Sequence, residues 1–243
     1  MSGVRWRFRP RLGPSVVVLS MVLLLVGLGT WQIQRMAWKE ALIADLVARG
    51  RQPSVPLPRV ITDPKALEFT PVRLRGKFLH DRELFISARV HKDEVGLNII
   101  TPFVLVDGRT VLVNRGWVPS ARRAPETRAA GQIAGVVTIE GQARIGGWNG
   151  YDLFRPANNP AKNQWLWMDL PAMAAYAGVD NALLSLYVTA GAAENPGGLP
   201  IGGAARVEVR NNHFGYAMTW FVLAIALLVI YVVHQSRTQN EDE

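Results

Sequence analysis

Near the end of the chain, one histidine and two aromatic residues have a spacing that places them on one helical face. Tyr216 and Trp220 follow His213 by three and seven positions, and residues so spaced share a side of a helix. A neutral imidazole is a common axial ligand of haem iron, and apolar walls beside it suit a porphyrin. The same pattern also fits an interfacial histidine in a belt of aromatic residues, which membrane helices form without any ligand. The residue types alone leave both interpretations open.

The other chemically reactive residue types offer no comparable site. Cysteine is absent, which excludes disulfides, thiolate metal sites and cysteine nucleophiles. The motifs of serine hydrolases, zinc peptidases and P-loop NTPases are also missing, so we expect a binding protein and not an enzyme. His80 and His91 lie among charged residues near expected strand ends, and we expect both to be solvated turn residues. His234 lies about 31 Å from His213 along a continuous helix, too far to ligate the same iron.

Two long apolar segments, one at each end of the chain, would position these side chains. No Asp, Glu, Lys or Arg occurs between Arg11 and Arg35, and none occurs between Arg210 and Arg237. The hydrocarbon core of a bilayer, about 30 Å thick, requires roughly 20 helical residues. Both segments meet that length. We therefore predict an integral membrane protein that crosses the lipid bilayer twice, over residues 14–34 and 211–234.

The distribution of charge predicts how these spans are oriented. The N-terminal tail, residues 1–13, contains four arginines and no acid, so the positive-inside rule places it in the cytoplasm. Residues 235–243 then form a second cytoplasmic tail, and residues 35–210 form a domain in the periplasm. The predicted location is therefore the inner membrane of the cell. A cleaved signal peptide is the alternative for the first segment. The helical pattern instead continues to about Arg49, with Gly50 as the stop, which favours a retained anchor.

The net charge of +8 reflects the arginine-rich tail and a mildly basic central domain. No cluster of Lys and Arg alternates with aromatic residues on a groove-like set of strands. We therefore expect no nucleic-acid partner.

The central segment has the pattern of an α+β domain built mainly from antiparallel strands. In residues 71–79, apolar and basic side chains alternate, as in a half-buried strand with a cationic outer face. Asp107 and Gly108 form a two-residue turn between two runs rich in Val and Leu. Asp169 and Gly178 are suited to cap a short helix. The expected strands cover residues 71–79, 83–90, 101–106, 109–118, 135–145, 184–192 and 205–210, and the expected helix covers residues 170–177.

Residues 148–167 combine aromatic side chains with several asparagines. Three interpretations fit this composition: a loop packed over the sheet, a lip that faces the membrane, or a docking surface for another membrane subunit. The sequence does not decide among them.

Six stretches of the chain, in this order, resemble the surfeit-locus family of cytochrome c oxidase assembly proteins. The first (GLGTWQIQRMAWKEALI), the fourth (VNRGWVP) and the last (NNHFGYAMTWF) are the most specific. The resemblance covers nearly the whole chain and is strengthened by the two terminal spans. The six stretches are residues 27–43, 71–86, 96–105, 113–119, 155–169 and 211–221.

The resemblance implies a role in maturing a haem–copper oxidase, by receiving haem a and passing it to the oxidase catalytic subunit. Haem a synthase is a further candidate partner. It also implies that His213 is the axial ligand of the haem iron, because His213 matches the family's proposed ligand at the start of the second span. Tyr216, Thr219 and Trp220 match the neighbouring motif positions.

On this hypothesis the function is binding and transfer, without turnover. We expect Tyr216 and Trp220 to flank the haem ring, and Arg35, at the outer end of the first helix, to neutralise a propionate. Arg115 and Arg210 are looser candidates for the same partner. The alternative is a structural membrane adaptor that docks oxidase subunits without holding haem.

Overall fold

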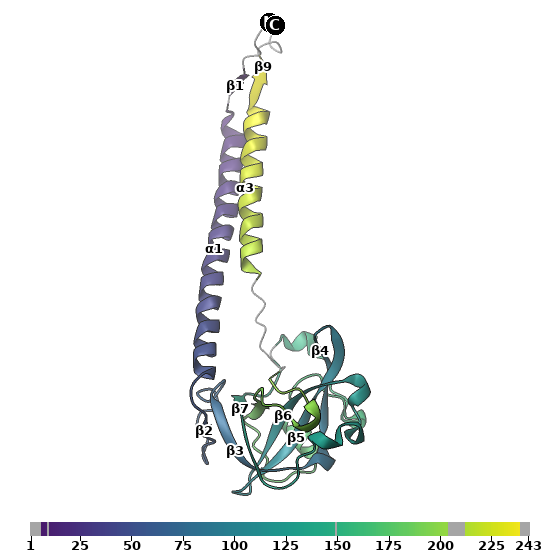
Figure 1. The fold of residues 1–243 in the computed structure, drawn as a ribbon. Helices are drawn as coiled ribbons and strands as arrows, with labels where there is room; N and C mark the ends of the chain where they lie inside the picture. Colours follow the sequence, from purple (N-terminus) through teal and green to yellow (C-terminus); the bar gives the residue numbers. More distant parts are fainter. Residues whose placement is uncertain (1–5, 9, 149, 204–211, 239–243) are drawn as a thin grey trace. The chain divides into compact units, whose positions relative to one another are not determined.

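The computed structural model describes residues 6–8, 10–148, 150–203 and 212–238 (Figure 1). The chain forms two compact units. The first comprises Met1–Asp45 and Glu208–Glu243, and the second is Leu46–Val207. Each unit has its own architecture.

The first unit is a pair of antiparallel helices, which run side by side in Figure 1. Helix α1 covers Leu12–Gly50 and helix α3 covers His213–Gln235. Both are long and apolar enough to cross a membrane. At the end of the pair where α1 begins and α3 ends, β1 (Trp6–Phe8) pairs antiparallel with β9 (Ser236–Thr238).

The chain therefore has two transmembrane helices that flank a β-rich domain, which confirms the predicted fold class. Helix α1 also ends at Gly50 as predicted, and its last turn belongs to the second unit. The residue limits proposed for the membrane-embedded parts of α1 and α3 stay predictions.

The second unit is a small β-barrel with two further strands. Five strands form a closed ring in the order β3, β7, β8, β6 and β5, because β5 pairs with β3 as well as with β6. Strand β4 pairs with β5, and β2 pairs in parallel with β3. The strands are β2 (Val55–Pro56), β3 (Pro71–Phe78), β4 (Leu84–His91), β5 (Glu94–Leu105), β6 (Thr110–Pro119), β7 (Val137–Arg144) and β8 (Tyr187–Ala190).

Barrel closure depends on a glycine. Gly76 in β3 pairs with Leu105 in β5, and a Cβ at this position would lie 2.1 Å from the carbonyl oxygen of Val104. Only a residue without a side chain permits this approach. Closure pairs both sides of β3 and β5, so the ring leaves neither of them as an exposed edge.

Alternation along the strands fills the barrel. Val72 and Leu74 are buried, whereas Arg73 and Arg75 are exposed, as the sequence predicts for β3. The strands β5, β6, β7 and β8 contribute further buried side chains to the same cluster, including Phe103, Val113 and Val188. The predicted turn also forms: Gly108 has a φ of +88°, and the amide of Arg109 donates to Asp107 Oδ1 at 3.2 Å.

A second core lies between the sheet and the segment that ends in α2 (Leu170–Tyr176). Asp169 caps this helix through the amide of Ala172, as predicted. Trp165 is fully buried in this core, and its indole donates to Asn163 Oδ1 at 3.0 Å. The shorter 3₁₀ helices are η1 (His80–Arg82), η2 (Ser120–Arg122), η3 (Pro125–Gly131), η4 (Asp152–Phe154), η5 (Pro160–Lys162) and η6 (Pro196–Gly198).

The amide-rich segment 148–167 is therefore a packed loop over part of its length. Asn163 also donates to the carbonyl of Glu83 at 2.8 Å, and Asn158 accepts from the amide of Leu166 at 2.8 Å. Its other part, around η4, remains exposed: Tyr151, Leu153 and Phe154 are 83%, 87% and 73% exposed.

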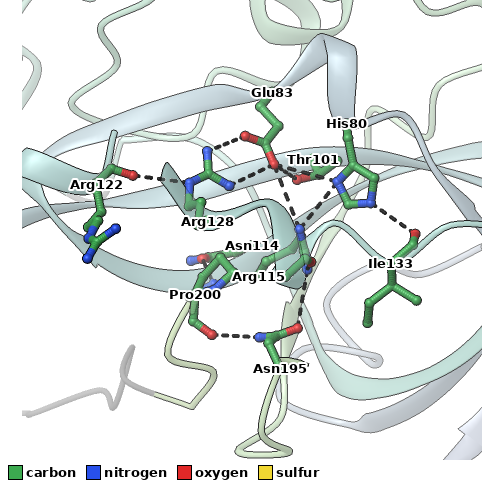
Figure 2. Close-up of polar contacts among 12 residues, drawn as sticks. His80, Glu83, Thr101, Asn114, Arg115, Arg122, Arg128, Ile133, Asn195 and Pro200 are labelled. Carbon is green, nitrogen blue, oxygen red and sulfur yellow. Dashed lines mark hydrogen bonds and ion pairs between the residues drawn. The ribbon is translucent and has the colours of Figure 1, made fainter. Parts of the chain in front are cut away.

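A charged network is buried inside the domain (Figure 2). Glu83 contacts Arg128 through both carboxylate oxygens and lies 3.7 Å from Arg115. The guanidinium of Arg115 also donates to the carbonyl of Gly131 and to Asn195 Oδ1 at 3.2 Å. One carboxylate thus stands against two guanidinium groups away from water.

The pKa values reflect this balance. Burial alone would raise the pKa of Glu83, but its contacts with His80 and Arg128 and the two guanidinium charges outweigh burial and hold the pKa below its ordinary value. Burial lowers the pKa of Arg115 to about 10, against the opposing effect of Glu83. Each charge in the network therefore depends on the others.

The expectation of solvated turn residues is wrong for both His80 and His91: His91 is the last residue of β4, is half-buried and packs against Trp117 with 5.2 Å between the ring centroids. His80 is not a solvated turn residue: it lies in η1 with a side chain only 15% exposed, and its Nε2 donates to the carbonyl of Ile133 at 3.0 Å. Its neighbours in sequence are charged, but the side chain of Glu83 is buried, and His80 Nδ1 lies 3.7 Å from its carboxylate. The predicted strand over residues 205–210 lies outside the described residues.

Glu83→Gln should destabilise the domain strongly, because it leaves two buried guanidinium groups without a counter-charge. Breaking a buried ion pair by removing one member costs about 3–5 kcal/mol, which corresponds to a fall of roughly 10 °C in the melting temperature of a domain of this size. The measurement is thermal unfolding of the full chain in mild detergent.

The pH dependence provides a second check of the same variant. Because the pKa of Glu83 is lowered in the folded state, its contribution to the free energy of unfolding is fully present above pH 4.5, the ordinary pKa of a glutamate. The contribution is lost as the pH falls through the folded pKa. The variant and the wild type should converge in acid. The matched control is Glu140→Gln, which removes an exposed partner of Arg73 and should leave the melting temperature nearly unchanged. Equal effects of both variants would contradict the account.

Candidate functional site

His213 is the first residue of α3 and is held by a residue of α1. Its Nδ1 lies 2.7 Å from Gln32 Oε1. An amide oxygen can only accept, so Nδ1 carries the proton and donates. In the neutral form of the ring the lone pair is then on Nε2, and no hydrogen bond to Nε2 is found among the described residues. The imidazole is half-buried.

Small residues allow the two helices to pack closely below this bond. Gly29 is buried in α1, and a Cβ there would lie 2.7 Å from the ring of Phe221. On α3, Ala217 and Ala224 are buried; they lie four and eleven positions after His213, on the face that meets α1. At the far end, Ser15 and Tyr231 share a hydrogen bond. These alanines therefore pack against α1.

The two aromatic residues predicted for the site share one face of α3, four residues apart, but differ in exposure. Trp220 is half-buried, whereas Tyr216 is 58% exposed. Tyr216 lies on the side of His213 away from Ala217, as expected from its position three residues later. Thr219 donates to the carbonyl of Gly215 at 3.0 Å and so satisfies its hydroxyl within the helix. The surface beside His213 that faces away from α1 is therefore aromatic and accessible.

The three arginines considered as propionate partners have different fates. Arg35 is exposed on α1, one turn beyond Gln32, and its guanidinium stacks over Trp38 at 4.1 Å from the ring centroid. Arg115 is 1% exposed inside the domain and bound to Glu83, Gly131 and Asn195, so it is not available to a ligand, contrary to the expectation from sequence. Arg210 lies outside the described residues.

The donor set at His213 fits a haem group. Among the described residues, no group of three or more His, Asp or Glu side chains could hold a metal ion. A single imidazole can supply one of the two axial positions that a porphyrin leaves on its iron, as the proximal histidine of globins does. Metal-bound histidines characteristically donate the N–H of their other ring nitrogen to an acceptor, as Nδ1 of His213 does to Gln32.

Gln32 is the residue of this site that sequence reasoning missed. Two glutamines, Gln32 and Gln34, lie at the end of an otherwise apolar segment, just before Arg35. Gln32 follows the buried Gly29 by three residues and is half-buried, whereas Gln34 is exposed. The usable signal was therefore the spacing from Gly29, which places Gln32 on the face that meets α3.

Comparison with known proteins gives a consistent result. The SURF1 family model matches residues 19–225, a range that includes both Gln32 and His213. A SURF1-like protein of Monosiga brevicollis is 38% identical over 92% of this chain and 88% of that protein. Surfeit locus protein 1 of Homo sapiens is 40% identical over 86% of this chain and 74% of that protein. A SURF1-like protein of Drosophila melanogaster is 37% identical over 82% of this chain and 70% of that protein.

Gly29→Leu should push α1 and α3 apart, because the space for a side chain is filled by Phe221. The chain has no cysteine, so nitroxide labels can be placed at Leu24→Cys and Val222→Cys, both exposed positions. Pulsed EPR should show the distance between the labels lengthen by roughly 2 Å and broaden, the scale on which contact side chains change helix separation.

The matched control is Gly27→Leu, since nothing lies within 4 Å of a Cβ at Gly27. This control should leave the distance unchanged, and adding Phe221→Ala to Gly29→Leu should restore it. A Gly29→Leu distance identical to that of the wild type would show that the helices do not pack through this glycine.

Proposed function

Because the chain belongs to the SURF1 family, known as cytochrome c oxidase assembly factors, we propose that it holds haem a on His213 and delivers it to the oxidase catalytic subunit. The observation that carries the proposal is the hydrogen bond from His213 Nδ1 to Gln32 Oε1 at 2.7 Å. This bond leaves Nε2 with a lone pair at an accessible, aromatic surface of α3. The function is binding and handover, in an assembly factor and not an enzyme.

The residues of the site would each have a separate task. His213 Nε2 ligates the iron, and Tyr216 and Trp220 contact the ring and exclude water from it. Arg35, exposed one turn from Gln32, pairs with a propionate at the membrane surface. Haem supplies an iron centre that the oxidase requires. The long apolar tail of haem a would lie against the apolar helices in the bilayer, where it costs no exposure to water.

The charge distribution supports a proposed location, and the family supports the proposed partners. An arginine-rich N-terminus stays in the cytoplasm, so the proposed place of the protein is the inner membrane with the domain Leu46–Val207 in the periplasm. His213 and Gln32 would then lie near the outer leaflet. The partners are the catalytic subunit as acceptor, and a haem a synthase as the candidate donor in the same bilayer.

His213→Ala should abolish haem binding. Co-expression with haem a synthesis and purification in mild detergent should yield a Soret band for the wild type and none for the variant, because the proposed protein ligand to the iron is removed. The matched control is His234→Ala, which changes an exposed histidine at the other end of α3 and should retain the band. A wild type without a Soret band, or a His213→Ala variant with an unchanged one, would refute the proposal.

A second function, as an adaptor that docks oxidase subunits without haem, is favoured by the exposed apolar residues around η4. Tyr151, Leu153 and Phe154 are all largely exposed, and the indole of Trp148 donates to the carbonyl of Tyr151 at 3.1 Å and fixes the turn. Exposed aromatic residues on a fixed turn are typical anchors of an interface. Docking through η4 is compatible with haem delivery by α3.

The triple variant Tyr151→Ser, Leu153→Ser and Phe154→Ser separates the two functions. It should retain the Soret band but lower the amount of assembled oxidase several-fold in cells that depend on this protein, because anchor residues at interfaces each contribute about 1–2 kcal/mol or more. Val60, Val106 and Val136 are exposed apolar residues outside η4, and replacing these three with serine is the control. Normal oxidase assembly in the triple variant would exclude docking through η4.

A further inference from the structure

The environment of Gln32 points to a role beyond joining two helices. Gln32 is half-buried on the face of α1 that meets α3, and its amide oxygen accepts from His213 Nδ1 at 2.7 Å. A polar side chain in an apolar helix is costly unless it is hydrogen-bonded. Gln34 has the same side chain two positions later but faces away and is exposed. Only one of the two glutamines is therefore placed to act on the imidazole.

The acceptor at His213 is neutral, and this has chemical consequences. A carboxylate in the place of Gln32 would draw the Nδ1 proton strongly and make Nε2 a strong ligand, whereas an amide oxygen polarises the ring less. Helix α3 contains no acidic residue. On α1 the nearest acid in sequence is Glu40, about 12 Å along the helix from Gln32. Among the described residues, the hydrogen-bond partner of the imidazole is therefore a neutral amide and not a carboxylate.

We propose that Gln32 is a positioning residue that keeps His213 in the Nδ1–H tautomer, aims Nε2 away from α1, and, being neutral, keeps the ligand bond weak enough for haem to be passed on. This inference rests on the proposed function. It adds a specific division of labour: His213 supplies the ligand atom, and Gln32 sets its protonation, its direction and its strength.

A purely structural role for Gln32 makes different predictions. If the hydrogen bond only stabilised the packing of α1 against α3, both Gln32→Leu and Gln32→Glu would disturb it. The rate of haem release would then change in the same direction in both variants. A positioning role predicts opposite effects for the apolar and the acidic replacement. It also predicts a change in the tautomer of His213 before any haem is present.

The first measurement uses the full chain without haem, in detergent, with ¹⁵N-labelled histidine. Long-range ¹H–¹⁵N spectra report which ring nitrogen carries the proton, and His213→Ala identifies the signals of His213 among the four histidines of the chain. We expect Nδ1–H in the wild type and in the control Gln34→Leu, and a shift of population towards Nε2–H in Gln32→Leu. An Nε2–H tautomer in the wild type would overturn the inference.

The second measurement is the rate at which the loaded protein loses haem to an excess of an apo-globin. Gln32→Leu should lose it about 10-fold faster and Gln32→Glu about 10-fold more slowly, the lower end of the effects of such outer partners on metal sites. Gln34→Leu should match the wild type. Wild-type rates in both Gln32 variants, or changes in the same direction, would overturn the positioning role while leaving haem binding by His213 intact. If the wild type shows no His213-dependent Soret band, the proposed function itself fails, and this inference fails with it.

Discussion

The hydrogen bond that His213 donates to Gln32 constrains both helices of the first unit at once. It joins the start of α3 to the polar end of the apolar segment of α1, satisfies two polar side chains near the membrane surface, and determines which ring nitrogen is left with a lone pair. The close contact of Gly29 with Phe221 and the buried alanines of α3 hold the helices near enough for this bond to form. The hydrogen bond between His213 and Gln32 thus depends on the packing of the apolar parts of α1 and α3.

The domain depends on a separate set of constraints. Its barrel closes because Gly76 permits β3 to approach β5, and its interior tolerates Arg115 and Arg128 because Glu83 lies between them. With no cysteine in the chain, these contacts and the apolar core stabilise the domain without disulfides. The exposed turn around η4 is part of this domain. The proposed haem site thus lies on the helices and the proposed docking surface lies on the domain, so separate variants can test the two functions.

The sequence predicts most of the fold because its patterns are local. The period of two in β3, the Asp107–Gly108 turn and the capping of α2 all depend on neighbouring residues, and the structure confirms them. Barrel closure was not predicted, since the β3–β5 pairing joins segments far apart in sequence. His80 and Arg115 look like surface residues until the inward turn of Glu83 is known. For the site, His213 could be singled out from its type and position, whereas choosing Gln32 over Gln34 required the packing of α1 against α3.

The central claim, that His213 binds haem through Nε2, is tested most directly by the magnetic coupling between the iron and the ring nitrogen. Pulsed EPR or ENDOR of the ferric, haem-loaded protein grown with ¹⁵N-histidine should show a strong ¹⁵N hyperfine coupling from one directly bound imidazole nitrogen. The coupling should be absent when only the other amino acids are labelled. A haem-loaded protein whose spectrum shows no coupling to ¹⁵N-histidine would contradict the account.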